Sequence, residues 1–207
     1  EREEVDYWFD FVGSEKIWEM AAGGGKLTVV TVNRQEVAEI IKKRINQKQS
    51  INWRLVELVG VYGKGMGEDG FLAEAFRQAA SNHNLILPTV GVKFRTLGVD
   101  DGVEAVLRAS FLSGTEGENF LVAGKETDSE EVARVLVDEA KMTRFKVMQK
   151  EMAVEKWRED EVRENWSKLR WEPRVDFKEG AVETLRYFLT KIDEENRRGR
   201  SEGRVRQ

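Results

Sequence analysis

A glycine-rich stretch at residues 65–70, GMGEDG, matches the G-x-G-x-x-G pattern that binds the pyrophosphate of a dinucleotide. The stretch follows an apolar run that predicts a strand and precedes a predicted helix, which is the context that the pattern requires. Glu68 and Asp69, however, would place negative charge against the pyrophosphate, and no acidic residue ends the next predicted strand to hold a ribose. We therefore favour a turn over a cofactor site at these glycines.

Three other groups of residues could carry chemistry, and each has a simpler interpretation. Residues 23–26, GGGK, are not a P-loop, because Leu27 stands where the magnesium-binding serine or threonine belongs. Asp100 and Asp101 form a pair of carboxylates, but they open a predicted helix, where carboxylates cap the free N–H groups. His83 is the only histidine and there is no cysteine, so we expect no metal site and no disulfide.

The composition limits the classes of protein to consider. The 207 residues suit one domain or one and a fraction, and 40% hydrophobic residues are enough for a core. A net charge of -4 gives no general attraction to nucleic acid or to an anionic membrane. Because no apolar run is long enough to span a bilayer and no secretion signal is present, we expect a protein of the cytoplasm or of an organellar lumen or matrix. The start at Glu1 indicates a processed, trimmed or partial chain.

Strand-like and helix-like patterns alternate along the chain. The most informative stretch, residues 85–109, reads as strand, turn, strand and then a helix that begins at the two aspartates. A capping box of Asp128 with Glu131 begins another helix. Further strands are predicted at residues 7–12, 27–32, 53–62 and 120–123, and further helices at 33–47, 71–80 and 179–192. This alternation indicates an α/β fold with a mostly parallel sheet.

Several of these segments carry short motifs in a fixed order. Residues 9–18 read FDFVGSEKIW, residues 54–65 read RLVELVGVYGKG and residues 99–105 read VDDGVEA. Two later blocks lie at 120–131 and 157–162, and the closing segment at 166–188 reads WSKLRWEPRVDFKEGAVETLRYF. In this order the blocks resemble those of the extended short-chain dehydrogenases, the NAD-dependent nucleotide-sugar epimerases and dehydratases. The closing segment is the most specific match.

The resemblance implies an incomplete Rossmann-like parallel sheet with helices on both faces and a small C-terminal cap similar to the family's substrate domain. The family's first half, with its glycine loop and four leading strands, has no counterpart, so the chain would begin at the fifth strand. We therefore expect a core at residues 1–140, a cap at 141–195 and a flexible tail at 196–207. The strands at 7–12 and 53–62 should be adjacent and parallel, and the sheet should have a bare edge.

The family's chemistry uses a Ser or Thr, a Tyr and a Lys, the tyrosine acting as general base toward a sugar hydroxyl while NAD takes hydride. The resemblance places the Ser/Thr position on Glu15, and the Tyr-x-x-x-Lys pair on Val30 and Arg34 or, after a shift of one residue, on Thr31 and Gln35. Neither register supplies a base, and arginine cannot replace lysine in tuning a tyrosine. The resemblance thus implies no catalytic residue and no cofactor, unless another chain supplies the missing half with NAD.

Two arginines remain as candidates for binding the diphosphate of a nucleotide-sugar. Arg158 matches the arginine of the family's R-P-G-D block, with Glu161 at the Asp, and Arg95 lies one residue from the position of a family arginine, which Phe94 occupies. Either guanidinium can hold a phosphate bidentately, although a surface arginine paired with a nearby acid explains each as well. The family's substrate-side Asn falls on Gly60.

These features lead to two main hypotheses about function. The first is a non-catalytic epimerase/dehydratase-like domain that acts as a structural or binding subunit of a larger assembly. The alternative is the substrate-binding half of a split or truncated nucleotide-sugar epimerase or dehydratase; nucleotide or sugar binding without chemistry is a third reading. We expect a homodimer or a complex with another subunit, through the aromatic residues of 7–11 or the helix at 33–47.

Overall fold

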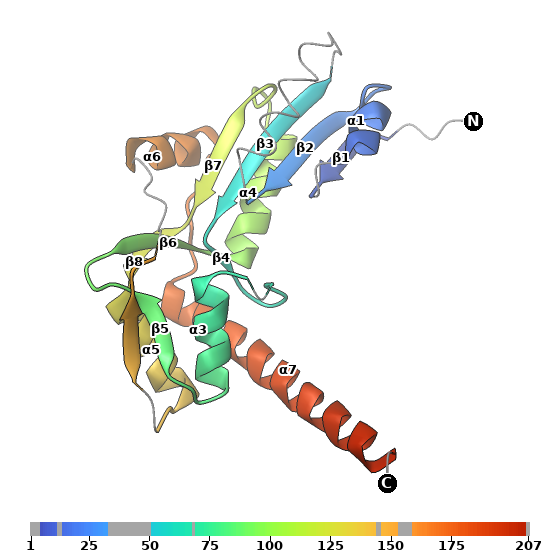
Figure 1. Ribbon diagram of the computed structural model, residues 1–207. Helices are drawn as coiled ribbons and strands as arrows, with labels where there is room; N and C mark the ends of the chain where they lie inside the picture. Colours follow the sequence, from blue (N-terminus) through green and yellow to red (C-terminus); the bar gives the residue numbers. More distant parts are fainter. Residues whose placement is uncertain are drawn as a thin grey trace. The chain divides into compact units, whose positions relative to one another are not determined.

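The computed structural model describes residues 5–11, 14–32, 51–67, 69–143, 146–152 and 159–205, without the side chains of Glu15 and of residues 198–205 (Figure 1). The chain forms two compact units. The first unit comprises Glu1–Val59, Asp100–Gly124 and Trp157–Pro173, and the second comprises Gly60–Val99, Lys125–Lys156 and Arg174–Gln207. This division differs from the expected boundaries at residues 140 and 195, because the chain returns to the first unit after entering the second.

Within the described residues of the first unit, four parallel strands form one sheet in the order β1-β2-β3-β7 (Figure 1). The strands are β1 (Tyr7–Asp10), β2 (Lys26–Thr31), β3 (Asn52–Val59) and β7 (Asn119–Ala123). Helix α1 (Glu15–Ala21) packs Trp18 against Leu27, Val29 and Leu55 on one face. Helix α6 (Glu159–Lys168) covers Leu121 and Ala123 on that face, and α4 (Val99–Phe111) lies on the other. The predicted Rossmann-like sheet with helices on both faces is confirmed.

One prediction about this sheet was wrong. The segments at 7–12 and 53–62 are not neighbours, because β2 lies between β1 and β3 and pairs with both. Residues 27–30 of β2 are buried, as expected of an interior strand covered on both faces. A start at the fifth strand of the family implied that these two segments pair directly. The chain therefore contributes one more strand, β2, to the parallel sheet than was expected. Strand β1 remains the edge strand, since within the described residues it pairs only with β2.

The second unit combines short strands with three helices around an aromatic core. Tyr62, Phe76, Phe177 and Phe188 are buried there, with ring centroids 5.3–6.2 Å apart in successive contacts. Its helices are α3 (Phe71–Ala80), α5 (Ser129–Ala140) and α7 (Phe177–Val205). Its strands are β4 (Val61–Tyr62), β5 (Leu85–Pro88), β6 (Lys93–Gly98), β8 (Lys125–Asp128) and β9 (Val147–Lys150), paired as β4-β6-β8 and β5-β9.

Most predicted elements of this part of the chain are confirmed. Residues 85–109 form strand, turn, strand and helix, and α3 has the predicted bounds. Asp128 caps α5 by accepting from the backbone N–H of Glu131 at 2.9 Å, while the Glu131 carboxylate accepts from Thr127 instead of completing the capping box. The expected tail at 196–207 is helical as far as Val205, because glutamate and arginine favour helix. The predicted helix at 33–47 lies outside the described residues.

Candidate functional site

The carboxyl ends of the parallel strands are where a doubly wound sheet binds its ligand. Asp10 ends β1, Thr31 ends β2, and Glu57 lies two residues before the end of β3. The strand register places these three side chains on the same face of the sheet. Asp10 and Glu57 are both buried. The described residues thus put carboxylates at the end of the sheet where a nucleotide phosphate would need positive charge or free N–H groups.

The glycine stretch at 65–70 belongs to the second unit and not to the parallel sheet. It joins β4, which pairs with β6, to α3, whose N-cap Gly70 has φ 92° and supplies no side-chain hydrogen bond. Gly65 also has a positive φ, of 85°, as glycines in tight turns do. Glu68 lies outside the described residues. The position of the stretch supports the interpretation as a turn, because a dinucleotide loop follows a strand of the parallel sheet.

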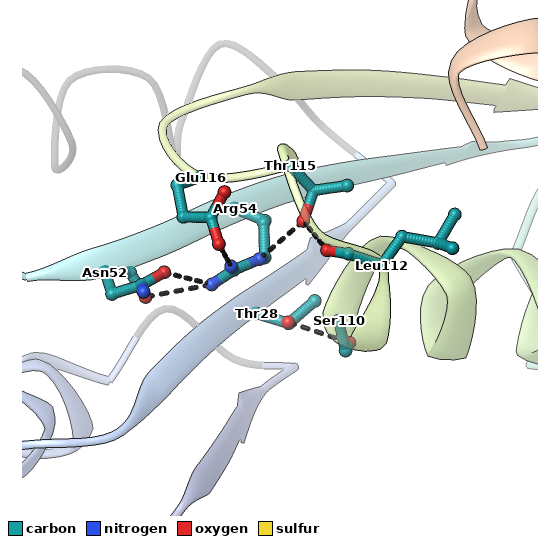
Figure 2. Close-up of polar contacts among 7 residues, drawn as sticks. All are labelled: Thr28, Asn52, Arg54, Ser110, Leu112, Thr115 and Glu116. Carbon is teal, nitrogen blue, oxygen red and sulfur yellow. Dashed lines mark hydrogen bonds and ion pairs between the residues drawn. The ribbon is translucent and has the colours of Figure 1, made fainter.

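A buried polar cluster lies at the opposite, amino end of β3 (Figure 2). Arg54 of this strand is 0% exposed. Its Nε donates to Thr115 Oγ1 at 3.0 Å, and its Nη1 donates to the Asn52 backbone oxygen at 3.2 Å and to Asn52 Oδ1 at 2.5 Å. The Nη2 atom forms an ion pair with Glu116 Oε1 at 3.0 Å. The guanidinium therefore reaches its partners through all three nitrogens.

The Arg54 cluster fixes the loop between α4 and β7 onto β3. Thr115 Oγ1 donates to the backbone oxygen of Leu112 at 2.8 Å while accepting from Arg54, and Gly117 N donates to the backbone oxygen of Trp53 at 2.8 Å (Figure 2). The cluster lies at the end of the sheet away from the expected ligand side, it contains no histidine, and its carboxylate, Glu116, is paired with Arg54. We therefore assign it a structural role.

The charges of this cluster influence each other. Burial lowers the pKa of Arg54, although the Glu116 carboxylate opposes that effect and an arginine stays charged at any ordinary pH. The pKa of Glu116 is lowered by its own backbone N–H, which hydrogen-bonds to the carboxylate, and also by Arg54. The carboxylate is therefore held in its charged form next to the buried guanidinium.

Replacing Glu116 with glutamine is expected to remove a pH-dependent contribution to stability. Because the pKa of Glu116 is lower in the folded state, its contribution is present above the ordinary value of 4.5 and is lost as the pH falls through the folded value. The difference in free energy of unfolding between wild type and Glu116→Gln should thus be constant near neutrality and shrink in acid. Urea unfolding from pH 7 to pH 3 measures it, with Glu19→Gln on α1 as the control. If the free energies of unfolding of wild type and Glu116→Gln differ by the same amount at every pH down to 3, the charged Glu116 carboxylate does not stabilise the folded state as described.

A second polar contact ties α4 to the sheet. Thr28 of β2 and Ser110 of α4 are buried with their hydroxyl oxygens 2.8 Å apart (Figure 2). Ser110 donates to the backbone oxygen of Val106 at 2.7 Å, so Thr28 is the donor to Ser110. Both hydroxyls are thereby used in packing the helix on the strand, and neither is placed as a nucleophile.

The positions that the resemblance gave to the catalytic groups do not form a site. Val30 and Thr31 lie in β2, which is paired on both sides, so a helical Tyr-x-x-x-Lys pair cannot start there and that alignment was wrong. Glu15 is the first residue of α1, and Arg34 and Gln35 lie outside the described residues. The absence of a suitable tyrosine does not depend on the alignment, because the sequence has none between positions 7 and 62.

All three tyrosines of the chain have packing roles. Tyr7 lies at the amino end of β1, where its ring centroid is 4.6 Å from that of Phe111. Tyr62 is buried in the core of the second unit, and its hydroxyl donates to the backbone oxygen of Asp176 at 3.4 Å. Tyr187 lies on α7 with its ring 5.5 Å from Phe188. The sequence of the connection between β2 and β3 contains none of them.

The structure describes only one of the two arginines suggested as phosphate ligands. Arg95 lies in β6 of the second unit, half-buried and opposite Glu126 in the antiparallel pair with β8. Phe94, at the family's arginine position, is buried with its ring 4.9 Å from Phe71. Arg158 lies outside the described residues, so its role as a ligand stays a prediction.

Gly60 shows why the family's substrate-side asparagine is absent at this position. The residue joins β3 to β4 with φ 64°, and a Cβ atom added to it would lie 2.1 Å from the backbone oxygen of Arg95. Leu97 N also donates to the Gly60 backbone oxygen at 3.0 Å, which holds the two segments together. The site of the asparagine side chain is therefore occupied by backbone, a fact that the sequence did not reveal.

The described residues show neither a metal-binding cluster nor a membrane-spanning helix. They contain no group of three or more histidine, cysteine, aspartate and glutamate side chains arranged to hold a metal ion. None of their helices is both long enough and apolar enough to cross a membrane.

Comparison with solved structures gives consistent results. The UDP-glucuronic acid 4-epimerase of Bacillus cereus, in complex with UDP-glucuronic acid and NAD, matches with a TM-score of 0.70 and 14% identity over 84% of this chain and 65% of that one. The epimerase Mth375 of Methanothermobacter thermautotrophicus matches with a TM-score of 0.75 and 15% identity over 95% of this chain and 75% of that one. The dTDP-glucose 4,6-dehydratase of Bacillus anthracis, in complex with NAD, matches with a TM-score of 0.68 and 15% identity over 91% of this chain and 74% of that one.

No family model and no curated protein matches the sequence. The chain spans 65% of the Bacillus cereus enzyme and about three quarters of the other two. At these identities the likeness establishes the fold. The chain therefore has the Rossmann-like α/β fold of the NAD-dependent nucleotide-sugar epimerases and dehydratases, as the order of its sequence blocks indicated.

Proposed function

We propose that this chain is an epimerase/dehydratase-like domain without hydride-transfer chemistry, which acts as a structural or binding subunit of a larger assembly. The observation that carries the proposal is the position of the three tyrosines. Each is committed to packing, and none lies in the connection between β2 and β3. Without a tyrosine general base, the proton of a sugar hydroxyl has no acceptor of the kind this chemistry uses.

Two features of the described residues support a domain that does not itself hold NAD. A dinucleotide requires free N–H groups and positive potential at the carboxyl end of the sheet, whereas Asp10 and Glu57 are buried on that side. The glycine stretch at 65–70 belongs to a different unit and begins a helix whose first turn carries Glu74.

The second candidate function is the substrate-binding half of a split or truncated nucleotide-sugar epimerase or dehydratase. It is supported by the part of each solved enzyme that the match leaves uncovered. Among the enzymes described above this part is largest in the Bacillus cereus epimerase, at 35%. In that case Arg95 and Arg158 would bind the diphosphate, and NAD would arrive with the other half. The closed position at Gly60 argues against this candidate, because it removes a substrate-side amide.

We expect the chain alone to convert none of UDP-glucose, UDP-glucuronic acid and dTDP-glucose in the presence of NAD. Product analysis by NMR together with absorbance at the NADH band measures turnover, and thermal unfolding measures binding. NAD should leave the melting temperature unchanged, since only a ligand of the native state raises it.

Turnover of any of the three sugars, or a rise in melting temperature with NAD, contradicts the proposal. A rise with a nucleotide-sugar alone that Arg158→Ala or Arg95→Ala abolishes supports the second candidate instead. The Arg163→Ala variant is the control, because Arg163 is an exposed arginine of α6 paired with Glu159 at 2.7 Å.

A further inference from the structure

Strand β9 forms an exposed sheet edge in the second unit. Among the described residues it pairs only with β5, and all of its residues, Val147–Lys150, are exposed. The other edge of this two-stranded sheet is occupied, because the backbone N–H of Ile86 on β5 donates to Gln78 Oε1 of α3 at 2.8 Å. A further strand can therefore extend this sheet only beside β9.

The backbone of β9 has hydrogen-bonding groups that point outward. Leu85 N donates to the Lys146 backbone oxygen at 2.9 Å, and Lys146 N donates to Asn84 Oδ1 at 2.8 Å, so the backbone of Lys146 faces β5. Successive residues of a strand direct their N–H and C=O groups to opposite sides, so those of Val147 and Gln149 face away from β5. No described residue pairs with these outward groups, which leaves them as a template for another strand.

The side chains on one face of β9 place two positive charges around an apolar residue. Met148 and Lys150 lie on the same face of the strand, and Lys146, directly before the strand, continues the alternation. Met148 is 42% exposed, and neither lysine forms an ion pair within the described residues. The order lysine, methionine, lysine is the same in both directions, so it suits a partner strand of either orientation.

A hollow of about 420 Å³ lies beside Met148 and has room for a side chain on this face. It is formed by α3 and the turn after it together with the strands, and its lining includes Glu74, Arg77, His83, Ile86 and Met148. The charge of Glu74 is balanced by Arg77, whose Nη2 lies 2.6 Å from Glu74 Oε2. The hollow therefore has no excess negative charge that would repel an acidic partner.

The charges on β9 argue against a second copy of the chain as the partner. Two copies of β9 that pair about a two-fold axis run antiparallel, with one residue opposite its own counterpart. The pairing that brings the two Met148 side chains together places Lys146 opposite Lys150 twice, and like charges directly opposite each other destabilise a sheet. In the neighbouring register, centred on Gln149, Met148 lies opposite Lys150 and has no apolar partner.

An acidic strand has the complementary pattern. Two carboxylates at alternate positions place opposite charges beside Lys146 and Lys150, and an apolar residue between them covers Met148. Lysines on an edge strand also keep unrelated strands away, so the same two residues would select for this partner.

We propose that β9 binds an extended acidic segment of another protein, in which two acidic residues flank an apolar residue at alternate positions. The backbone of this segment pairs with the outward groups of Val147 and Gln149 and extends the sheet. Its apolar side chain packs on Met148 beside the hollow. The proposal goes beyond the proposed function, since turnover of a nucleotide-sugar by the chain would leave this edge unchanged.

The test titrates the whole isotope-labelled chain with the blocked peptide T-E-T-V-T-E-T and follows the backbone amides by NMR. The amide signals of Val147 and Gln149 should shift on binding, and their hydrogen exchange should slow about tenfold or more at saturation. The amide of Met148, which faces β5, should change less. The blocked peptide T-K-T-V-T-K-T, with the charges reversed, should bind about tenfold more weakly or not at all.

A charge reversal on β9 tests the side-chain pattern. Lys150→Glu should weaken binding of the acidic peptide about fivefold or more and strengthen binding of the lysine peptide. Lys178→Glu makes the same charge change at an exposed residue in the first turn of α7 and should leave both dissociation constants unchanged. Circular dichroism checks that both variants keep the fold.

Three results overturn the proposal. The first is the absence of shifts at Val147 and Gln149, or acidic-peptide binding that Lys150→Glu does not weaken; the lysines then only protect the edge. The second is a set of shifts confined to Arg77 and His83, which indicates a ligand of the hollow alone. The third is a dimer of the chain without peptide that protects the amide of Val147, which makes a second copy the occupant.

Discussion

Replacing Arg54 with alanine is expected to lower the free energy of unfolding by about 3–4 kcal/mol. The side chain is 0% exposed and donates three hydrogen bonds to Asn52 and Thr115 in addition to its ion pair. Its removal leaves a cavity and takes the donor away from the buried hydroxyl oxygen of Thr115. This loss is smaller than the largest ones seen when a buried ion pair is broken, because the side chain of Glu116 is 45% exposed and its charge can be hydrated by water.

Urea unfolding at pH 7 measures the effect of Arg54→Ala. Arg163→Ala is the matched control, since its ion pair at 2.7 Å is on the surface and should contribute less than about 1 kcal/mol. Arg54→Lys keeps the charge but not the three nitrogens of the guanidinium. Its loss in free energy of unfolding should therefore lie between the losses of Arg54→Ala and Arg163→Ala. If Arg54→Ala is within about 1 kcal/mol of Arg163→Ala, the cluster does not fix the loop as described.

Replacing Gly60 with asparagine, the residue of the resembled family, is expected to destabilise the chain by about 3 kcal/mol or more and to create no substrate binding. The Cβ atom would lie 2.1 Å from the backbone oxygen of Arg95, so the strands must move apart. Asparagine tolerates the positive φ of 64° better than other residues do. The close approach is therefore the larger part of the expected loss.

Gly65→Asn separates the two causes. Gly65 has φ 85°, but nothing lies within 4 Å of its added Cβ, so this variant tests the backbone conformation without the clash. It should cost about 1 kcal/mol or less, measured by urea unfolding alongside Gly60→Asn. Equal losses in the two variants, or a rise in melting temperature with UDP-glucose in Gly60→Asn, contradict the explanation.

Elements that depend on local patterns were predictable from the sequence. The apolar periodicity of residues 71–80 gave the bounds of α3, and residues 85–109 folded as predicted because their turns and first helical residues are local signals. The position of β2 was not predictable in this way. Residues 27–32 showed strand propensity, but the insertion of that strand between β1 and β3 depends on pairing with distant segments.

The features of the candidate site depended still more on distant contacts. An arginine within the apolar run at 53–62 was a signal of a buried, paired charge, yet its partners Thr115 and Glu116 lie about 60 positions along the chain. Gly60 reads as an ordinary turn residue until the backbone of Arg95 is placed beside it. Motif alignment located Val30 in a catalytic position, whereas strand propensity placed it in a strand, and the pairing of β2 on both sides confirms the strand.

The interleaving of the two units sets the order in which the protein can fold during synthesis. Strands β1 to β3 leave the ribosome before their neighbour β7, which begins at Asn119, and before the covering helix α6, which ends at Lys168. At about 5–20 residues per second, the nascent sheet waits for about 3–13 seconds with the outer edge of β3 unpaired. Its contacts are also distant in sequence, which slows folding. The newly made chain should thus depend on chaperones more than a protein of two consecutive domains does.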